Sequence, residues 1–267
     1  MKKNLINIVS NTNFETRKVK ENVEEKLIER NFKISKTFDH EAELTISIGG
    51  DGAFLKAIHN NRFPRMPIVG INTGTLGFFQ EINPNKIDEF LDLYEAKDYC
   101  EEASYMLRAD VYTKNRKFTL HAINEVILKG KDSKIIQMAV EIDQNHLENF
   151  AGDGILVSTP VGSTAYNFSL GGAIVYSTLE SLQMTPMAPL NSRAYRSLKS
   201  PIIVPGQTKI SLKPTSRYRN SSIIVVDGSE KEFWDLLKLD ITMSNKYIRR
   251  LIFKKDFYWQ NLKDKFL

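Results

Sequence analysis

The stretch LTISIGGDGAFLKAI, residues 44–58, indicates how the first part of the chain folds. Its opening residues, LTISI, are rich in apolar and β-branched side chains and predict a buried strand. A helix is predicted over residues 53–59, so residues 49–52, GGDG, form the turn that joins the strand to the helix. In a parallel sheet covered by helices, such turns lie at the carboxyl ends of the strands, where ligands gather.

The same alternation of strands and helices extends over roughly the first 95 residues. The predicted strands are residues 4–9, 32–38, 44–48 and 67–71, and the predicted helices are residues 16–30 and 53–59. Strands separated by helices predict βαβ units. We therefore expect an α/β domain with a parallel sheet over residues 1–100.

Near residues 97–104 the character of the sequence changes, because the runs that follow are strand-like. They predict a larger, β-rich domain over residues 101–253. The predicted strands are residues 106–113, 118–129, 134–142, 154–160, 200–206, 208–214 and 221–228. The tail, residues 254–267, returns to helical spacing, and we expect this helix to pack back on the first domain.

Composition narrows the classes of protein and partner. The 267 residues include 37 Lys and Arg against 32 Asp and Glu, a net charge of +5 that favours phosphate-bearing partners but is equally consistent with a solvated basic surface. Cys100 is the single cysteine, so an intrachain disulfide is excluded and a reducing compartment is expected. No apolar run has the length of a signal peptide or a membrane span, and no nucleic-acid-binding module is recognisable. We expect a cytoplasmic protein without membrane or nucleic-acid partners.

Asp51 is the unusual residue of the GGDG turn. Glycines allow a phosphate to approach the main chain closely, whereas the carboxylate of Asp51 repels that phosphate unless a cation or a hydroxyl lies between them. The residue types therefore indicate a reaction or metal binding in addition to phosphate binding. The alternative is a tight turn in which Asp51 caps the helix through Ala53.

Familiar catalytic and nucleotide-binding signatures are missing from the sequence. It contains no P-loop, no complete Gly-x-Gly-x-x-Gly after a strand and no Gly-x-Ser-x-Gly elbow. The four histidines form no i, i+4 pair and have no cysteine near them. A zinc site is therefore not expected.

Two further blocks carry polar groups suited to a nucleotide. GDGILVSTPVGSTAYNFSLGGA, residues 152–173, combines five glycines with hydroxyl, amide and carboxylate side chains, which suit sugars, phosphates and a purine edge; a plain Gly/Ser-rich loop is the alternative. Asn124 and Glu125 interrupt the apolar run HAINEVIL. Neighbours in a strand point to opposite faces, so at least one of the two is expected to be buried, where a ribose diol would supply donors to a carboxylate. A β-bulge or an edge position explains this dipeptide as well.

Taken together, these blocks resemble the NAD kinases, which phosphorylate the ribose of NAD to make NADP. The resemblance rests on GGDG (49–52), INTGTLGFF (71–79), NEV (124–126), GDGILVSTPVGSTAYNFSLGGAIV (152–175) and LNSRAYRSLKSPIIVP (190–205). GGDG alone is shared with diacylglycerol and sphingosine kinases. The long block at residues 152–175 is far more specific.

The resemblance implies an N-terminal α/β domain, a β-rich C-terminal domain and a ligand site between them that a neighbouring subunit completes, in a homodimer or homotetramer. It implies Asp51 as general base on the 2′-hydroxyl of the adenosine ribose. It also implies ATP, another triphosphate or polyphosphate as donor, with Mg²⁺ or another divalent cation that the protein alone does not fix. The implied phosphate loop consists of Gly49, Gly50, Gly52, Asn72, Thr73 and Gly74. The implied NAD-binding residues are Asp51, Gly52, Phe78, Asn124, Glu125, Asp153, Ser158, Thr164, Ala165, Tyr166, Ser169 and Ala188.

Within that set, Asn124 and Glu125 would meet ribose or phosphate groups, and Asp153 and Ala188 would reach the nucleotide from a subunit interface. Residues 164–166 and Ser169 would line the adenine and nicotinamide regions. Two departures affect donor binding: Ala53 stands where the family usually has threonine, and Ala151 stands where it commonly has a basic residue.

Two other functions fit parts of the sequence. A lipid kinase of the diacylglycerol kinase type shares the phosphate loop, but it needs an apolar or amphipathic surface, and no such segment is evident. A sensor that binds NAD or NADP without chemistry fits the changes at Ala53 and Ala151. Asp51 argues against a sensor, because a pure binding site gains nothing from a carboxylate that faces phosphate.

Overall fold

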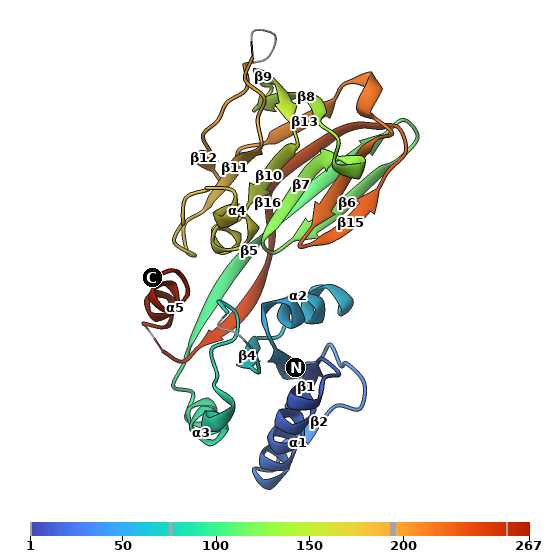
Figure 1. Cartoon of the computed structure of the whole chain (residues 1–267). Helices are drawn as coiled ribbons and strands as arrows, with labels where there is room; N and C mark the ends of the chain where they lie inside the picture. The colour runs from blue at the N-terminus through green and yellow to red at the C-terminus, as the bar shows by residue number, and fades with distance from the viewer. Residues whose placement is uncertain (1, 75–76, 193–195, 255) are drawn as a thin grey trace. The chain divides into compact units, whose positions relative to one another are not determined.

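The computed structural model describes residues 2–74, 77–192, 196–254 and 256–267, and the chain forms two compact units (Figure 1). Unit 1 consists of Met1–Ala103 and Ile248–Leu267, and unit 2 is Ser104–Tyr247. Residues 75–76 of the INTGTLGFF motif and residues 193–195 of the LNSRAYRSLKSPIIVP motif lie outside the described residues. The domain limits expected from the sequence stay a prediction.

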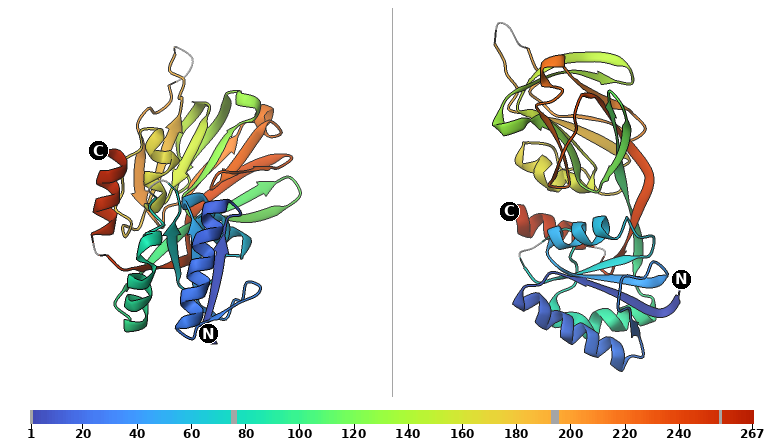
Figure 2. Two further views of the ribbon diagram at one scale, coloured as in Figure 1. Left: turned by 60° about the horizontal axis from the view of Figure 1, so that its bottom comes forward. Right: turned by 90° about the vertical axis from the view of Figure 1, so that its right-hand side faces the viewer.

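Unit 1 is a parallel sheet with helices on both faces. Its strand order is β2-β1-β3-β4-β16, with β1 (Lys2–Ser10), β2 (Lys33–Ile34), β3 (Ala42–Gly49), β4 (Ile68–Asn72) and the end of β16 (Leu236–Ile252). The helices are α1 (Phe14–Glu29), α2 (Asp51–Asn60), α3 (Ile87–Ala96) and α5 (Phe257–Phe266). Figure 2 shows α1 and α3 on one face of this sheet and α2 and α5 on the other.

The helix α1 shows why this part of the chain folds as predicted. The side chain of Asn13 accepts the N–H of Thr16 at 2.9 Å and so caps the helix, while Val23 and Leu27 are fully buried against the sheet. Removing these apolar side chains from water is the main stabilising term at this contact, because the ion pairs that join α1 to α3 are exposed and contribute little. The helices predicted over residues 16–30 and 53–59 are confirmed.

Two local predictions in unit 1 need correction. The strand predicted over residues 32–38 is much shorter, because β2 spans only Lys33–Ile34. The helix α3 was not predicted, although its residues Ile87, Phe90 and Leu91 are buried at helical spacing.

The tail helix packs on unit 1, as predicted. The side-chain amide of Asn261 in α5 donates to the carbonyl of Gly77 at 2.7 Å, and the ring of Phe78 contacts the rings of Tyr258 and Phe266. No helix among the described residues is long and apolar enough to span a membrane.

Unit 2 is built from two antiparallel sheets. One has the order β12-β11-β10-β7-β14-β15, and the other contains β9, β8, β13, β16, β5 and β6. Their bounds are β5 (Cys100–Thr113), β6 (Lys117–Ala122), β7 (Glu125–Gly130), β8 (Ile136–Ile142), β9 (Asn145–Gly152), β10 (Gly154–Ser158), β11 (Ser181–Met187), β12 (Ile202–Pro205), β13 (Ile210–Pro214), β14 (Ser222–Val226) and β15 (Ser229–Glu232). The strands β5 and β16 each have one end in unit 1. The fold class, an α/β part followed by a larger β-rich part with a packed tail helix, is therefore confirmed.

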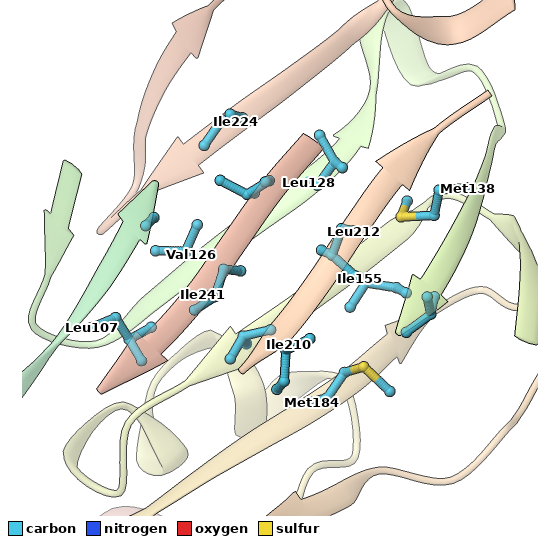
Figure 3. Close-up of a cluster of buried hydrophobic side chains, with 14 of the residues drawn as sticks. Leu107, Val126, Leu128, Met138, Ile155, Met184, Ile210, Leu212, Ile224 and Ile241 are labelled. Carbon is cyan, nitrogen blue, oxygen red and sulfur yellow. The ribbon is translucent and has the colours of Figure 1, made fainter. Parts of the chain in front are cut away.

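The core of unit 2 is formed by side chains from both sheets (Figure 3). Val126 and Leu128 of β7 point into it, together with Ile155 of β10. Successive residues of a strand face opposite sides, so Glu125 and Ile127 of β7 lie on the outer face of the six-stranded sheet. This outer face carries the polar residues of the candidate site.

Candidate active site

In unit 1 the phosphate-loop residues meet at the carboxyl ends of neighbouring parallel strands. Gly49 at the end of β3 pairs with Asn72 at the end of β4, and the N–H of Thr73 donates to the carbonyl of Gly49 at 3.1 Å. The side chain of Asn72 accepts the N–H of Gly74 at 2.9 Å. The structure thus brings the GGDG turn and residues 72–74 together, as the resemblance implies.

Asp51 is the first residue of α2, and its carboxylate is held by a second loop. Its two oxygens accept the N–H groups of Phe78 and Phe79, each at 3.0 Å. The N–H of Ala53 donates to the carbonyl of Gly50 instead, so the alternative in which Asp51 caps the helix through Ala53 is wrong. A Cβ at Gly77 would overlap the Asp51 carboxylate, so this close approach requires glycine.

The loop that holds Asp51 is fixed from its other side. The guanidinium of Arg250 donates to the carbonyl of Phe78 at 2.8 Å and lies 5.2 Å from the ring centre of Phe79. Burial lowers the pKa of the Arg250 guanidinium, whose side chain also pairs with Glu102. Because these groups are buried and hydrogen-bonded, the carboxylate of Asp51 has a defined orientation.

In unit 2 the sequence-predicted residues Asn124, Glu125 and Ser158 come together. Glu125 and Ser158 are directly opposite each other on β7 and β10, on the outer face of the sheet. Buried oxygens of all three side chains, Asn124 Oδ1, Glu125 Oε2 and Ser158 Oγ, have no hydrogen-bond partner in the described part of the chain. Buried polar atoms are nearly always paired in proteins, so this group is suited to a ligand that donates hydrogen bonds.

The carboxyl group of Glu125 is strongly affected by its surroundings. Only 6% of the residue is exposed. Burial, followed by the negative charge of Asp227, raises the pKa of Glu125 to about 8. Glu125 is therefore poised to change its protonation state near neutral pH.

Asp227 was not predicted from the sequence, and its side chain fixes the backbone that carries Asn124 and Glu125. Its carboxylate accepts the N–H groups of Ile123, Asn124 and Glu125 at 2.7, 2.8 and 3.1 Å. Ile123 and Asn124 lie between β6 and β7, and their N–H groups bind Asp227. The single strand predicted over residues 118–129 is therefore wrong, because β6 and β7 are separate strands. The Asp-Gly pair at residues 227–228, with φ of +45° and +78°, is a hairpin signal that the sequence did contain.

The segment after β10 covers the same face of the sheet. It contains two short helical turns, Val161–Thr164 and Tyr166–Ser169, and Leu170 packs on the outer-face cluster that includes Ile127 and Leu156. Buried hydrogen bonds fix its path: Asn167 is fully buried and accepts the hydroxyl of Thr185 at 2.6 Å. Of the predicted lining residues, Thr164 is buried, Ala165 is half-buried, and Tyr166 and Ser169 are exposed.

Asp153 and Ala188 lie elsewhere in unit 2. The N–H of Asp153 donates to the carbonyl of Met187 at 3.0 Å, which places Asp153 and Ala188 next to each other, and both are exposed. They adjoin Gly154, at the end of β10 opposite Ser158, roughly 13 Å away along the strand. The structure brings these two residues together but separates them from Glu125.

The two departures from the family pattern are both buried positions. Ala53 lies against Gly49, whose φ is +152°. The N–H of Ala151 in β9 donates to the hydroxyl of Ser197 at 3.0 Å. Among the described residues, no three His, Cys, Asp or Glu side chains form a group that could hold a metal ion.

Comparison with known proteins places the chain in a family. A model of the ATP-NAD kinase N-terminal domain matches residues 2–99, and a model of the ATP-NAD kinase C-terminal domain matches residues 123–250. The NAD kinase of Finegoldia magna is 44% identical over 267 residues, covering 98% of each chain. NAD kinase 1 of Oceanobacillus iheyensis is 35% identical over 237 residues, covering 86% of this chain and 88% of the relative. The chain therefore belongs to the NAD kinase family.

Solved structures agree with this assignment. The crystal structure of an NAD kinase from Archaeoglobus fulgidus in complex with ATP has a TM-score of 0.78 and 25% identity, and covers 98% of each chain. The yeast NADH kinase complexed with NADH has a TM-score of 0.84, covering 98% of this chain and 86% of that one; at 21% identity it shows the fold alone.

Proposed function

We propose that this protein phosphorylates NAD at the 2′-hydroxyl of the adenosine ribose, with Asp51 as the general base. As a member of the NAD kinase family, it is an enzyme that transfers a phosphoryl group from ATP to NAD. A lipid kinase and a non-catalytic sensor are not favoured by this family membership. The observation that carries the proposal is the carboxylate of Asp51, fixed by two main-chain N–H groups beside the phosphate loop.

The geometry of Asp51 suits a base. A secondary hydroxyl is a poor nucleophile until its proton is taken, and a positioned carboxylate typically accelerates such a step by about 10²–10⁴. Each oxygen of Asp51 accepts one N–H group, and a carboxylate has about four lone-pair sites, so each oxygen keeps a site for the substrate proton. Fixing the carboxylate in advance removes the cost of orienting it during the reaction.

Unit 2 supplies groups for the nucleotide. We assign Asn124, Glu125 and Ser158 to hydrogen bonds with ribose hydroxyls or neighbouring phosphates, because their buried oxygens lack partners within the described chain. Thr164, Ala165, Tyr166 and Ser169 are assigned to the adenine and nicotinamide regions. The 43% exposed ring of Tyr166 offers a stacking surface for a base. In unit 1, Phe78 and Gly52 are assigned to the same substrate, beside Asp51.

The remaining assignments concern the donor and the assembly. ATP would bind to the phosphate loop of residues 49–52 and 72–74 together with Mg²⁺ or another divalent cation, which neutralises phosphate charge. The cation would arrive with ATP, because Mg²⁺ in such sites is held largely by substrate phosphates and water. Asp153 and Ala188 would act from a neighbouring subunit, in a homodimer or homotetramer, because both are exposed and distant from Glu125 along β10. We place the enzyme in the cytoplasm, where its one cysteine, Cys100, would stay reduced.

The variant Asp51→Asn tests the base. The amide keeps the size of the carboxylate but is a very weak base, and we expect kcat to fall by about 10²–10⁴ while NAD binding is retained. Because Asn can accept only one of the two N–H groups, the variant also loosens the loop at residues 77–79. The matched control is Asn261→Ala, which removes the hydrogen bond to Gly77 on the same loop and leaves the carboxylate intact.

NADP formation from NAD, ATP and Mg²⁺ gives kcat for both variants, and calorimetry gives NAD affinity. A loss in Asp51→Asn that exceeds the loss in Asn261→Ala at least tenfold supports the base. Equal losses in the two variants would reduce Asp51 to an anchor for the loop.

A further inference from the structure

The carboxylate of Asp51 among phosphate-binding glycines calls for a nearby cation. Lys265 in α5 supplies one: its Nζ lies 4.0 Å from Asp51 Oδ2 and 4.9 Å from the ring centre of Phe78. A separation of 4.0 Å is longer than a hydrogen bond, so the N–H groups of the ammonium are not engaged by this carboxylate. The contact is charge attraction across a short gap.

Other contacts of α5 determine where Lys265 lies. Asn261 and Lys265 are four residues apart and therefore lie on the same face of the helix. Asn261 donates to the carbonyl of Gly77, and the ring of Phe266 lies 5.9 Å from that of Phe78, centre to centre. Since the N–H of Phe78 in turn binds Asp51, the helix and the carboxylate are held by the same loop.

Anchoring α5 does not require Lys265. The hydrogen bond of Asn261 and the ring contacts of Phe78 would remain if the ammonium were removed. The side chain of Lys265 is 32% exposed, and that of Asp51 is 29% exposed, so both charges are accessible to a ligand from solvent. A surface ion pair at this separation stabilises a fold only weakly.

We infer that Lys265 binds the phosphate groups of the donor, offsetting the repulsion between that anion and the carboxylate of Asp51. This inference rests on the proposed function, since it places the donor phosphates beside Asp51. The lysine acts as a fixed positive charge and takes part in no bond making or breaking. Its contribution is electrostatic stabilisation of an anion by a positioned cation.

The variants Lys265→Met, Lys265→Arg and Lys263→Met test the inference. Lys263 lies on the same helix, is exposed and serves as the matched control. We expect Lys265→Met to lower kcat/KM for ATP about tenfold and to leave KM for NAD unchanged, because a part-exposed charge contributes less than a buried one. Lys265→Arg should retain activity within about threefold, and Lys263→Met should match the wild type.

Two further measurements separate charge from structure. The ratio between wild type and Lys265→Met should shrink at about 0.5 M KCl, because salt screens an exposed charge. Calorimetry with a non-hydrolysable ATP analogue and Mg²⁺ should show the same loss of affinity without any turnover. A loss that salt leaves unchanged, or an equal loss in Lys263→Met, would overturn the inference.

The two proposals fail in different ways. If the wild type makes no NADP, the proposed function is wrong, and the analogue titration still decides whether Lys265 binds phosphates. If the wild type makes NADP and Lys265→Met is indistinguishable from it in both assays, Lys265 has no role with the donor and the kinase assignment stands.

Discussion

The protonation of Glu125 leads to a measurable dependence of NAD affinity on pH. Burial and the charge of Asp227 raise the pKa of Glu125 to about 8, so most molecules of the free protein carry a protonated Glu125 at pH 7. An ionised carboxylate accepts hydrogen bonds from both hydroxyls of a ribose, whereas the protonated form has fewer acceptor sites. NAD should therefore bind preferentially to the ionised form and release a proton.

The size of the effect follows from the pKa. If only the ionised form binds, affinity is reduced by the factor 1 + 10^(pKa − pH), which is about 30 at pH 6.5 and about 4 at pH 7.5. Affinity should thus rise roughly 25-fold between pH 6.5 and pH 8.5. In Glu125→Gln the side chain has the same size but does not titrate, so its NAD affinity should be nearly constant over this range.

Calorimetry with NAD and without ATP measures the NAD affinity at each pH and the number of protons released on binding. Repeating the titration in buffers of different ionisation enthalpy counts the protons released, and we expect about 0.8 per NAD bound at pH 7.5 for the wild type and none for Glu125→Gln. A flat affinity profile in the wild type would show that NAD binding does not depend on ionisation of Glu125. A slope that persists in Glu125→Gln would show that another group titrates on binding.

Two other predictions concern unit 1. Burial raises the pKa of Glu81 to about 7, although its carboxylate accepts the N–H groups of Phe253 and Lys254. Because the folded-state pKa of Glu81 lies above the ordinary value of 4.5, the stability that Glu81 contributes is complete below about pH 4.5 and is lost as pH rises to 7, a change of about 3 kcal/mol. Urea unfolding at pH 5 and pH 7.5 should show this loss of unfolding free energy in the wild type and a smaller loss in Glu81→Gln. An equal loss in the two proteins would contradict this prediction. Gly77→Ala would push a methyl group into the carboxylate of Asp51, so kcat should fall more than about tenfold. Thermal unfolding should show that the variant is still folded. An unchanged kcat would mean that this contact does not set the geometry of the base.

The sequence predicted the parts of the fold that local patterns encode. Buried strands followed by amphipathic helices identified the α/β part, and the glycine-flanked Asp51 marked the turn between β3 and α2, because both signals lie within about fifteen residues. The long strand β16 was not predicted. Its residues pair with β4 near one end and with β13 near the other, so the reason for its extended backbone lies in segments far away in the sequence.

Some residues of the candidate site could likewise be predicted from the sequence, and others could not. Asn124, Glu125 and Ser158 could be named from the sequence, since polar residues in apolar strands stand out. The contribution of Asp227 depends on the hairpin that returns it to the amides of residues 123–125, and a turn motif gives no sign of such a partner. Lys265 had no distinguishing feature in the sequence, because one lysine among exposed charges in a tail helix is ordinary.

The geometry of Asp51 depends on segments from three parts of the chain. The GGDG turn provides the carboxylate, residues 77–79 provide the amides that hold it, and the last part of the chain provides Arg250 and Asn261, which hold the carbonyls of that same loop. Each peptide of the loop thus has its N–H or its carbonyl fixed by a side chain distant in sequence. Arg250 and Asn261 thus orient the carboxylate of Asp51 through this loop, and Lys265 places a positive charge 4.0 Å from it. The orientation of the Asp51 carboxylate is therefore a property of the tertiary packing of unit 1, and the GGDG turn alone does not create it.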